Sequence, residues 1–254
     1  NIDFNYPMNE AIEEGYISDY VLHIEYFTKG DKTKSLVEMI KMNYNWCPMF
    51  VYFNTVEKCK TFSKLLNKEN ISSTYLTGNT SKNRRNKVKL GLKDGSIKVI
   101  CLCGVFNEGI SIDELQTVVY GDMRYSQINK IQIAMRANRL HKDKPYYRIV
   151  LPIIENDFSE QDIHKLIKTF CKIDPRIKEA IKRKSTTRIK ISLDSNNIEL
   201  EDAEYLYEEI YSKVGDLVSG LTQEEKVDEL LEYVNINKTS PNRKIYFTDK
   251  CNMG

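Results

Sequence analysis

Three side chains between residues 132 and 139 could together bind an anionic, oxygen-rich group. Gln132, Arg136 and Arg139 are spaced i, i+4 and i+7, so on one continuous helix they would project from a single stripe. The two guanidinium groups are planar, permanently charged forks that match phosphate oxygens. The spacing therefore predicts phosphate chemistry here. The alternative is a solvated helix face that carries two unrelated arginines.

Cationic side chains are also concentrated between residues 176 and 190, where Glu179 is the single acid. Such a cluster can follow the phosphate backbone of a nucleic acid and release its counterions. We expect the consecutive Lys182, Arg183 and Lys184 to make these contacts. The alternative is a helix whose lysine stems cover apolar surface while their charges stay in water.

The elements that must position these groups alternate between strand and helix. Apolar or alternating runs predict strands over 20–27, 49–53, 72–76, 98–103, 117–120 and 147–151, the last stopped by Pro152. Helices are expected over 32–42, from the cap Thr55 to 67, from the cap Ser81 to 94, and from Ser126 through Arg139. This order predicts an α/β fold, a doubly wound parallel sheet with helices on both faces.

The pattern changes near residue 156. Helices are expected over 159–171, 176–184, 200–214 and 222–234, with one short strand over 187–193. We therefore predict an α/β domain over 1–155, followed by a mainly helical accessory region over 156–254.

Polar turns follow several of the predicted strands. In doubly wound sheets, ligands bind beyond the carboxyl ends of the strands, where short residues let backbone amides approach phosphates. The same residues also serve ordinary strand-to-helix turns, so each turn alone is weak evidence. The turns contain Asn54 and Thr55, Thr77 and Gly78, residues 104–111, and Gly121 and Asp122.

Composition limits the class of protein. The chain has 254 residues, 41% hydrophobic and 29% charged, which is typical of a globular protein. A net charge of +2 leaves any nucleic-acid binding to local patches. No apolar run approaches the ~18 residues of a membrane helix, and we expect no membrane partner. The start at Asn1 predicts a piece of a longer protein.

The cysteines and histidines do not predict a metal site. Among 6 cysteines none forms a C-x-x-C pair, and the 3 histidines show no ligand spacing. Cys101 and Cys103 lie two apart in a predicted strand, so we expect them to be small core residues. Their thiols predict an intracellular, reducing compartment, the cytoplasm or a virion.

The order of these features resembles the second RecA-like domain of superfamily 2 DEAD/DEAH-type helicases, in their restriction-associated and viral branch. The run MFVYFNT at 49–55 is similar to the strand and turn that open that domain, and TYLTG at 74–78, followed by Arg84 and Arg85, to its next strand and helix. NEGISIDEL at 107–115 resembles the family's fifth motif, E-G-(I/V)-D-(I/V)-P. QIAMRANR at 132–139 resembles the sixth, Q-x-x-G-R-x-x-R, and YGDMRYS at 120–126 the D-P-R-x-S segment.

The resemblance implies an ATP-dependent helicase or translocase, with ATP in a cleft shared with a first RecA-like domain of the same polypeptide. It implies a catalytic role for Gln132, Arg136 and Arg139. Nucleotide contacts are implied at Glu108, Gly109, Ser111 and Asp113. Contacts to DNA or RNA are implied at Asn54, Thr55, Thr77, Gly78 and Arg84, and the cluster at Lys182, Arg183 and Lys184 would add to them.

The resemblance also has departures. Ser111 stands where the fifth motif has aspartate, Asp113 where it has proline, and Met135 where the sixth has glycine. No G-x-x-x-x-G-K-[ST] run and no acidic D-E-x-[DH] box occur, so the phosphate loop and the Mg²⁺ ligands are expected on the first domain. A catalytically silent RecA-like module that binds nucleic acid or protein is one alternative. An unrelated α/β enzyme is another, although no dinucleotide loop or nucleophile elbow supports it.

Overall fold

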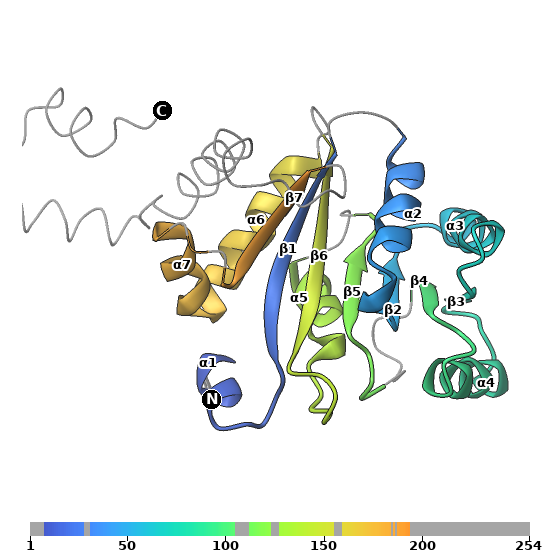
Figure 1. The fold of residues 1–254 in the computed structure, drawn as a ribbon, viewed down its shortest axis with the longest axis horizontal. Helices are drawn as coiled ribbons and strands as arrows, with labels where there is room; N and C mark the ends of the chain where they lie inside the picture. Colours follow the sequence, from blue (N-terminus) through green and yellow to red (C-terminus); the bar gives the residue numbers. More distant parts are fainter. Residues whose placement is uncertain are drawn as a thin grey trace, which may run out of the picture.

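The fold is a parallel sheet with helices on both faces (Figure 1). The computed structural model describes residues 8–27, 31–104, 112–122, 127–154, 159–183, 185 and 187–193. They build a 7-stranded sheet in the order β3-β4-β2-β5-β6-β1-β7, in which neighbouring strands are parallel. The strands are β1 (Asp19–Phe27), β2 (Met49–Tyr52), β3 (Ser73–Thr77), β4 (Val99–Cys103), β5 (Thr117–Tyr120), β6 (Tyr146–Ile154) and β7 (Ile189–Leu193). The predicted fold class is confirmed.

The helices begin where the sequence provides caps. Thr55 and Ser81 accept hydrogen bonds from the backbone N–H groups of Lys58 and Arg84, as predicted, and Asp31 caps α2 in the same way. The helices are α1 (Met8–Glu13), α2 (Lys32–Met42), α3 (Val56–Lys68), α4 (Lys82–Lys93), α5 (Gln127–Ala134), α6 (Ser159–Ile173) and α7 (Pro175–Lys182). Short 3-10 turns are η1 (Tyr44–Trp46) and η2 (Met135–Ala137).

The core consists of two apolar layers, one on each face of the sheet. Side chains of α4, α5, α6 and α7 pack with Tyr20 and Leu22 of β1 on one face, and those of α2 and α3 pack with Val51 on the other. All of β2 is buried, as expected for a strand covered on both faces. Cys101 and Cys103 are 0% and 8% exposed in the second layer, so their prediction as core residues is confirmed.

The helix that carries Gln132 ends earlier than the sequence predicts. After α5 the backbone tightens into the 3-10 turn η2, and the carbonyls after η2 accept hydrogen bonds from Ser18, which is distant in sequence. Ser18 N donates to Asn138 O, and Ser18 Oγ donates to Arg139 O, each at 2.7 Å. Arg139 therefore lies outside the helix. The prediction that Gln132, Arg136 and Arg139 share one helical stripe is wrong.

Pro152 does not stop its strand, contrary to prediction. It lies inside β6, opposite Glu25 of β1. Proline has no backbone N–H to donate. Because the pairing of β6 with β5 ends at Val150, Pro152 interrupts no hydrogen bond between these two strands. The sheet also continues past residue 155, because β7 pairs with β1 from Leu22 to Tyr26. Helices α6 and α7 share the core of the sheet. The division at residue 155 stays a prediction, and residues 194–254 lie outside the described part of the chain.

Candidate functional site

Arg139 and Asp113 meet at the amino edge of the sheet. Arg139 Nη1 lies 3.3 Å from Asp113 Oδ1, and the two side chains are 57% and 52% exposed. The segment with Asp113 precedes β5, and Ser18, which holds the Arg139 backbone, precedes β1. Both therefore lie where the strands begin. An exposed guanidinium on a fixed backbone can receive an anionic ligand from outside this chain.

Arg136 and Gln132 lie on the same connection between β5 and β6. Arg136 is half-buried on η2, and Gln132 is exposed on α5. Burial raises the pKa of Tyr52, and the positive charge of Arg136 acts in the opposite direction. The structure thus brings Arg136 and Arg139 to one turn. Gln132 lies before this turn, on α5.

A second group of predicted residues lies at the opposite, carboxyl edge. Asn54 follows β2, and its backbone N–H donates to Asp122 Oδ2 at 3.0 Å, at the end of β5. Lys58 Nζ donates to Asp122 Oδ1 at 2.8 Å. Thr55 is exposed and caps α3. Asp122 therefore ties the first turn of α3 to the end of β5.

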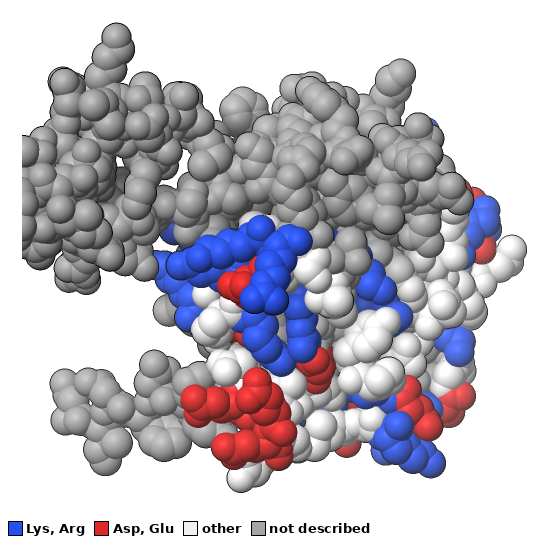
Figure 2. Space-filling model, turned by 60° about the vertical axis from the view of Figure 1, so that its left-hand side comes forward, with Lys and Arg blue, Asp and Glu red and all other residues white. Residues whose placement is uncertain are grey.

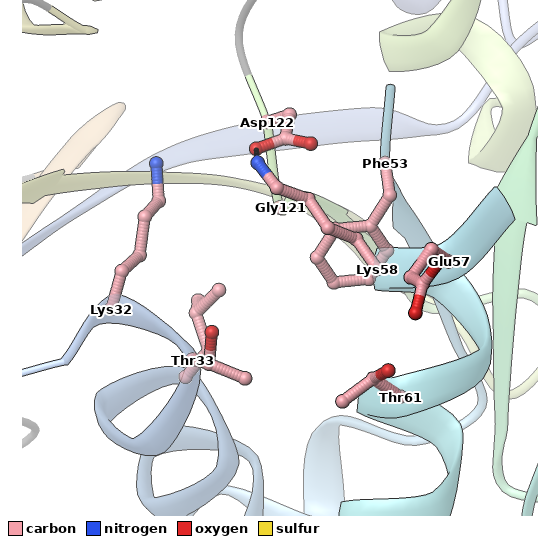
Figure 3. A pocket seen from close by; sticks show the side chains of 9 residues that line it. Lys32, Thr33, Phe53, Glu57, Lys58, Thr61, Gly121 and Asp122 are labelled. Carbon is pink, nitrogen blue, oxygen red and sulfur yellow. Dashed lines mark hydrogen bonds and ion pairs between the residues drawn. The ribbon is translucent and has the colours of Figure 1, made fainter. Parts of the chain in front are cut away.

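A pocket of about 200 Å³ opens beside this contact. Figure 3 shows Lys32 and Thr33 on the α2 side, and Glu57, Lys58 and Thr61 on the α3 side. Phe53 fills its inner end: a Cβ on Gly121 would lie 2.5 Å from that ring, so only glycine fits. The cation of Lys58 is already paired with Asp122, and most of the surface that lines the pocket is apolar.

Thr77 and Gly78 end β3 at the same carboxyl edge. The Thr77 N–H donates to Thr80 Oγ1 at 2.9 Å, and Arg85 Nη2 donates to Gly78 O at 2.8 Å. A Cβ on Gly78 would lie 3.4 Å from the carbonyl oxygen of Gly104, so the ends of β3 and β4 approach closely. These turns hold each other in a fixed arrangement.

A polar groove of about 350 Å³ continues from this turn around the edge strand β3. Arg84 and Lys60 approach the ring of Tyr75, at 5.2 and 5.7 Å from its centroid. Exposed cation–π contacts of this kind are weak, so both cations could move to a phosphate. The groove is lined by Val56, Lys60, Tyr75, Thr77, Asn79, Thr80, Ser81 and Arg84. The sequence analysis missed Lys60 and Tyr75, because α3, β3 and α4 meet here only in the folded chain.

The cluster at 176–190 divides into two kinds of cation. Arg176 donates to Asp174 Oδ2 at 2.7 Å, and Arg188 pairs with Asp19, so both have structural partners. Lys182 and Arg183 are exposed, although Arg183 Nε lies 2.6 Å from a Glu179 oxygen. Figure 2 shows Lys and Arg side chains gathered on this side of the molecule, where α6 and α7 lie in Figure 1.

Four predicted site residues lie outside the described part of the chain: Glu108, Gly109, Ser111 and Lys184. Among the residues that are described, no three His, Cys, Asp or Glu side chains come together as a set that could hold a metal ion. None of the described helices has the length and apolar character needed to cross a membrane.

Comparison with known proteins matches residues 31–141 to the helicase conserved C-terminal domain family. The ATP-dependent RNA helicase RhlB of Pseudomonas aeruginosa is 29% identical over 111 residues, 43% of this chain and 28% of that protein. The probable helicase A859L of African swine fever virus is 24% identical over 174 residues, 61% of this chain and 20% of that protein. The chain thus spans about a quarter of the length of these curated relatives.

Solved structures show the same fold. A DNA-bound ATP-dependent Type ISP restriction-modification enzyme, LlaBIII, superposes with a TM-score of 0.68 at 16% identity, over 94% of this chain and 20% of that chain. Saccharomyces cerevisiae Dbp5 bound to RNA and ADP BeF3 superposes with a TM-score of 0.50 at 14% identity, over 76% of this chain and 45% of that chain. Together with the match at residues 31–141, these superpositions show that the chain has the RecA-like fold of helicase C-terminal domains.

Proposed function

We propose that this chain is the C-terminal motor half of an ATP-dependent nucleic-acid helicase or translocase. The observation that carries the proposal is the placement of two sites on one RecA-like sheet. The backbone of Arg139 is fixed at the amino edge, and Arg136 lies three residues earlier on η2. A cationic groove with Thr77 and Arg84 lies toward the carboxyl edge. A first RecA-like domain of the same polypeptide would complete the ATP site.

Each edge would have its own ligand. Arg136 and Arg139 would stabilise charge on the phosphoryl group that ATP transfers, and Asp113, with the segment around Glu108, Gly109 and Ser111, would contact the nucleotide. Mg²⁺ would be held by the first domain, because the motifs that bind it in such motors, the phosphate loop and the acidic box, do not occur in this sequence. Closure of two domains on ATP, and opening after hydrolysis, would then move the strand.

The nucleic acid, DNA or RNA, would lie along the carboxyl edge. Asn54, Thr55, Thr77 and Gly78 would lie beside the phosphate backbone, and the Thr55 hydroxyl, which accepts a hydrogen bond as the helix cap, could still donate to a phosphate oxygen. Lys60 and Arg84 would pass from the ring of Tyr75 to phosphates, which leaves the ring as a stacking surface for an unpaired base.

A catalytically silent binding module is the second candidate, favoured by Ser111 and Met135. The structure accommodates Met135, because its sulfur accepts a hydrogen bond from Tyr147 at 3.6 Å and its side chain packs against the core. Nucleic-acid binding by the complete protein without any ATP hydrolysis would support this candidate.

We expect the isolated chain to hydrolyse no ATP above background. It lacks the phosphate loop and the acidic box that activate the γ-phosphate in such motors. The measurement is phosphate release by the purified chain, with and without DNA or RNA, beside the complete natural protein. Turnover by the chain alone that a substitution within it abolishes would refute the two-half arrangement.

We expect α7 to contribute salt-dependent affinity for nucleic acid. Replacing Lys182, Arg183 and Lys184 with glutamine should reduce the log–log salt slope by roughly 0.7–0.9 for each phosphate that the protein no longer neutralises. The matched control replaces three exposed lysines on α2 and α3, namely Lys34, Lys64 and Lys68. If affinity and slope are the same in both variants, the α7 cations are only a solvated face.

A further inference from the structure

Lys144 holds together the two segments that carry Asp113 and the arginines. Its residue is only 5% exposed, although lysine normally keeps its charge in water. The ammonium donates to Asp113 O at 2.9 Å and Leu115 O at 3.1 Å, both in the segment before β5. It also donates to Ala137 O at 2.7 Å, the last residue of η2. All three N–H groups of the ammonium are therefore used.

The acceptor carbonyls of Asp113 and Leu115 lie outside the helices and strands, and that of Ala137 lies at the end of η2. Ala137 O lies at the C-terminus of η2, where helical carbonyls remain unsatisfied and favour a cation. The next two carbonyls, of Asn138 and Arg139, accept from Ser18. Three consecutive carbonyls, 137 to 139, are thus fixed from two sides, by Lys144 and by Ser18.

The same ammonium bonds to both of the segments that meet at the pair of Arg139 and Asp113. The side chains of these two residues form an exposed pair, which by itself contributes little to holding the segments together. Lys144 joins the backbone of Asp113 to that of Ala137, two residues before Arg139, in a buried place where charge-assisted hydrogen bonds are stronger and more specific. Acidic side chains of Asp113 and Glu114 also face this ammonium and favour its charged form.

We propose that Lys144 is a positioning residue that sets the backbone of Arg136 and Arg139 relative to the Asp113 segment, and so aligns the phosphate-facing groups. This inference rests on the proposed function of those arginines. Burial lowers the pKa of Lys144 to about 8, with Asp113 and Glu114 acting in the opposite direction, so the ammonium is still mostly protonated at neutral pH.

The first test needs no activity. In the chain with Lys144→Met, the amides of Leu115 and Asn138 should exchange with solvent roughly 10- to 100-fold faster, as expected when charged hydrogen bonds are removed. The amide of Val119 in β5 should be unaffected. The matched control is Lys142→Met, since Lys142 is exposed in the same turn. Lys144→Gln retains one donor group and should accelerate exchange in one segment more than in the other.

The second test uses the complete natural protein. Lys144→Met should lower kcat for ATP hydrolysis by about 10- to 100-fold, the effect of a small misplacement of catalytic groups. KM for ATP should change less than about twofold, since the arginines act mainly in the transition state. A merely structural residue would lower the melting temperature and all activities together.

The outcomes separate the two proposals. Unchanged exchange at both Leu115 and Asn138 in the Met and Gln variants would overturn the positioning role. Faster exchange in both segments with an unchanged kcat would also overturn it. Faster exchange in a complete protein that hydrolyses no ATP would support the backbone arrangement and refute the proposed motor function instead.

Discussion

Arg136→Lys and Arg139→Lys should each lower the rate of ATP hydrolysis by the complete protein by roughly 10³–10⁵-fold, or about 4–7 kcal/mol in activation free energy. The reason is geometric: a lysine supplies a point charge, whereas the planar fork of arginine matches two phosphate oxygens at once. The backbone that carries Arg139 is fixed by Ser18, so a shorter or differently shaped head group cannot be compensated by movement of the chain.

The competing explanation predicts a much smaller effect. Arg139 pairs with Asp113 at 3.3 Å in an exposed setting, and such surface pairs contribute about 0–1 kcal/mol to stability. The measurements are kcat, nucleic-acid affinity and melting temperature, with Lys34→Arg as an exposed control. Near-normal hydrolysis in both variants would remove the arginines from catalysis. A rate loss that accompanies a large fall in melting temperature would show that the arginine stabilises the fold and does not act in catalysis.

Asp174→Ala should destabilise the fold by about 3–5 kcal/mol, the range for breaking a buried ion pair. Asp174 is 0% exposed and caps α7. It accepts from Arg176 N at 3.0 Å, Nε at 2.9 Å and Nη2 at 2.7 Å. Removal leaves Arg176, whose side chain is 22% exposed, without this partner. Urea unfolding measures the change, and Asp143→Ala, with its side chain 71% exposed, is the control.

The same carboxylate makes stability depend on pH. Burial raises the pKa of Asp174, but hydrogen bonds from Arg176 and its charge outweigh this effect, so the pKa lies below its ordinary value. A group of this kind stabilises the fold above its unfolded pKa, and the contribution is lost as pH falls through the folded pKa. Stability in acid should therefore decline less steeply in Asp174→Ala than in the parent. Equal stability of the two proteins at neutral pH would contradict the role of this cap.

Local patterns in the sequence were sufficient to predict the strands of the sheet and the helices that pack on its faces. The run 49–53 is apolar because a parallel strand buried on both faces has no solvated side, and β2 is buried throughout. Thr55 and Ser81 cap helices because their oxygens satisfy N–H groups only three residues away. Such signals depend on neighbours in the chain, so they can be read before any tertiary contact is known.

Contacts between distant residues decided the rest. The end of α5 depends on Ser18 and Lys144, which donate hydrogen bonds to the carbonyls of η2 and of the residues after it. Pro152 is tolerated inside β6 because its partner strand β5 is short. β7 joins the sheet through β1, from more than a hundred residues away along the chain.

The candidate sites divide in the same way. The sequence by itself determined the residue types: arginines spaced for phosphate, hydroxyls and glycines at strand ends, and cations on α7. Only the tertiary structure decided that Arg139 meets Asp113 at the amino edge, that Lys60, Tyr75 and Arg84 form one groove, and that Arg176 and Arg188 are used by Asp174 and Asp19. The reason is that spacing along a chain fixes which side chains can share an element, whereas packing of the sheet fixes which elements meet.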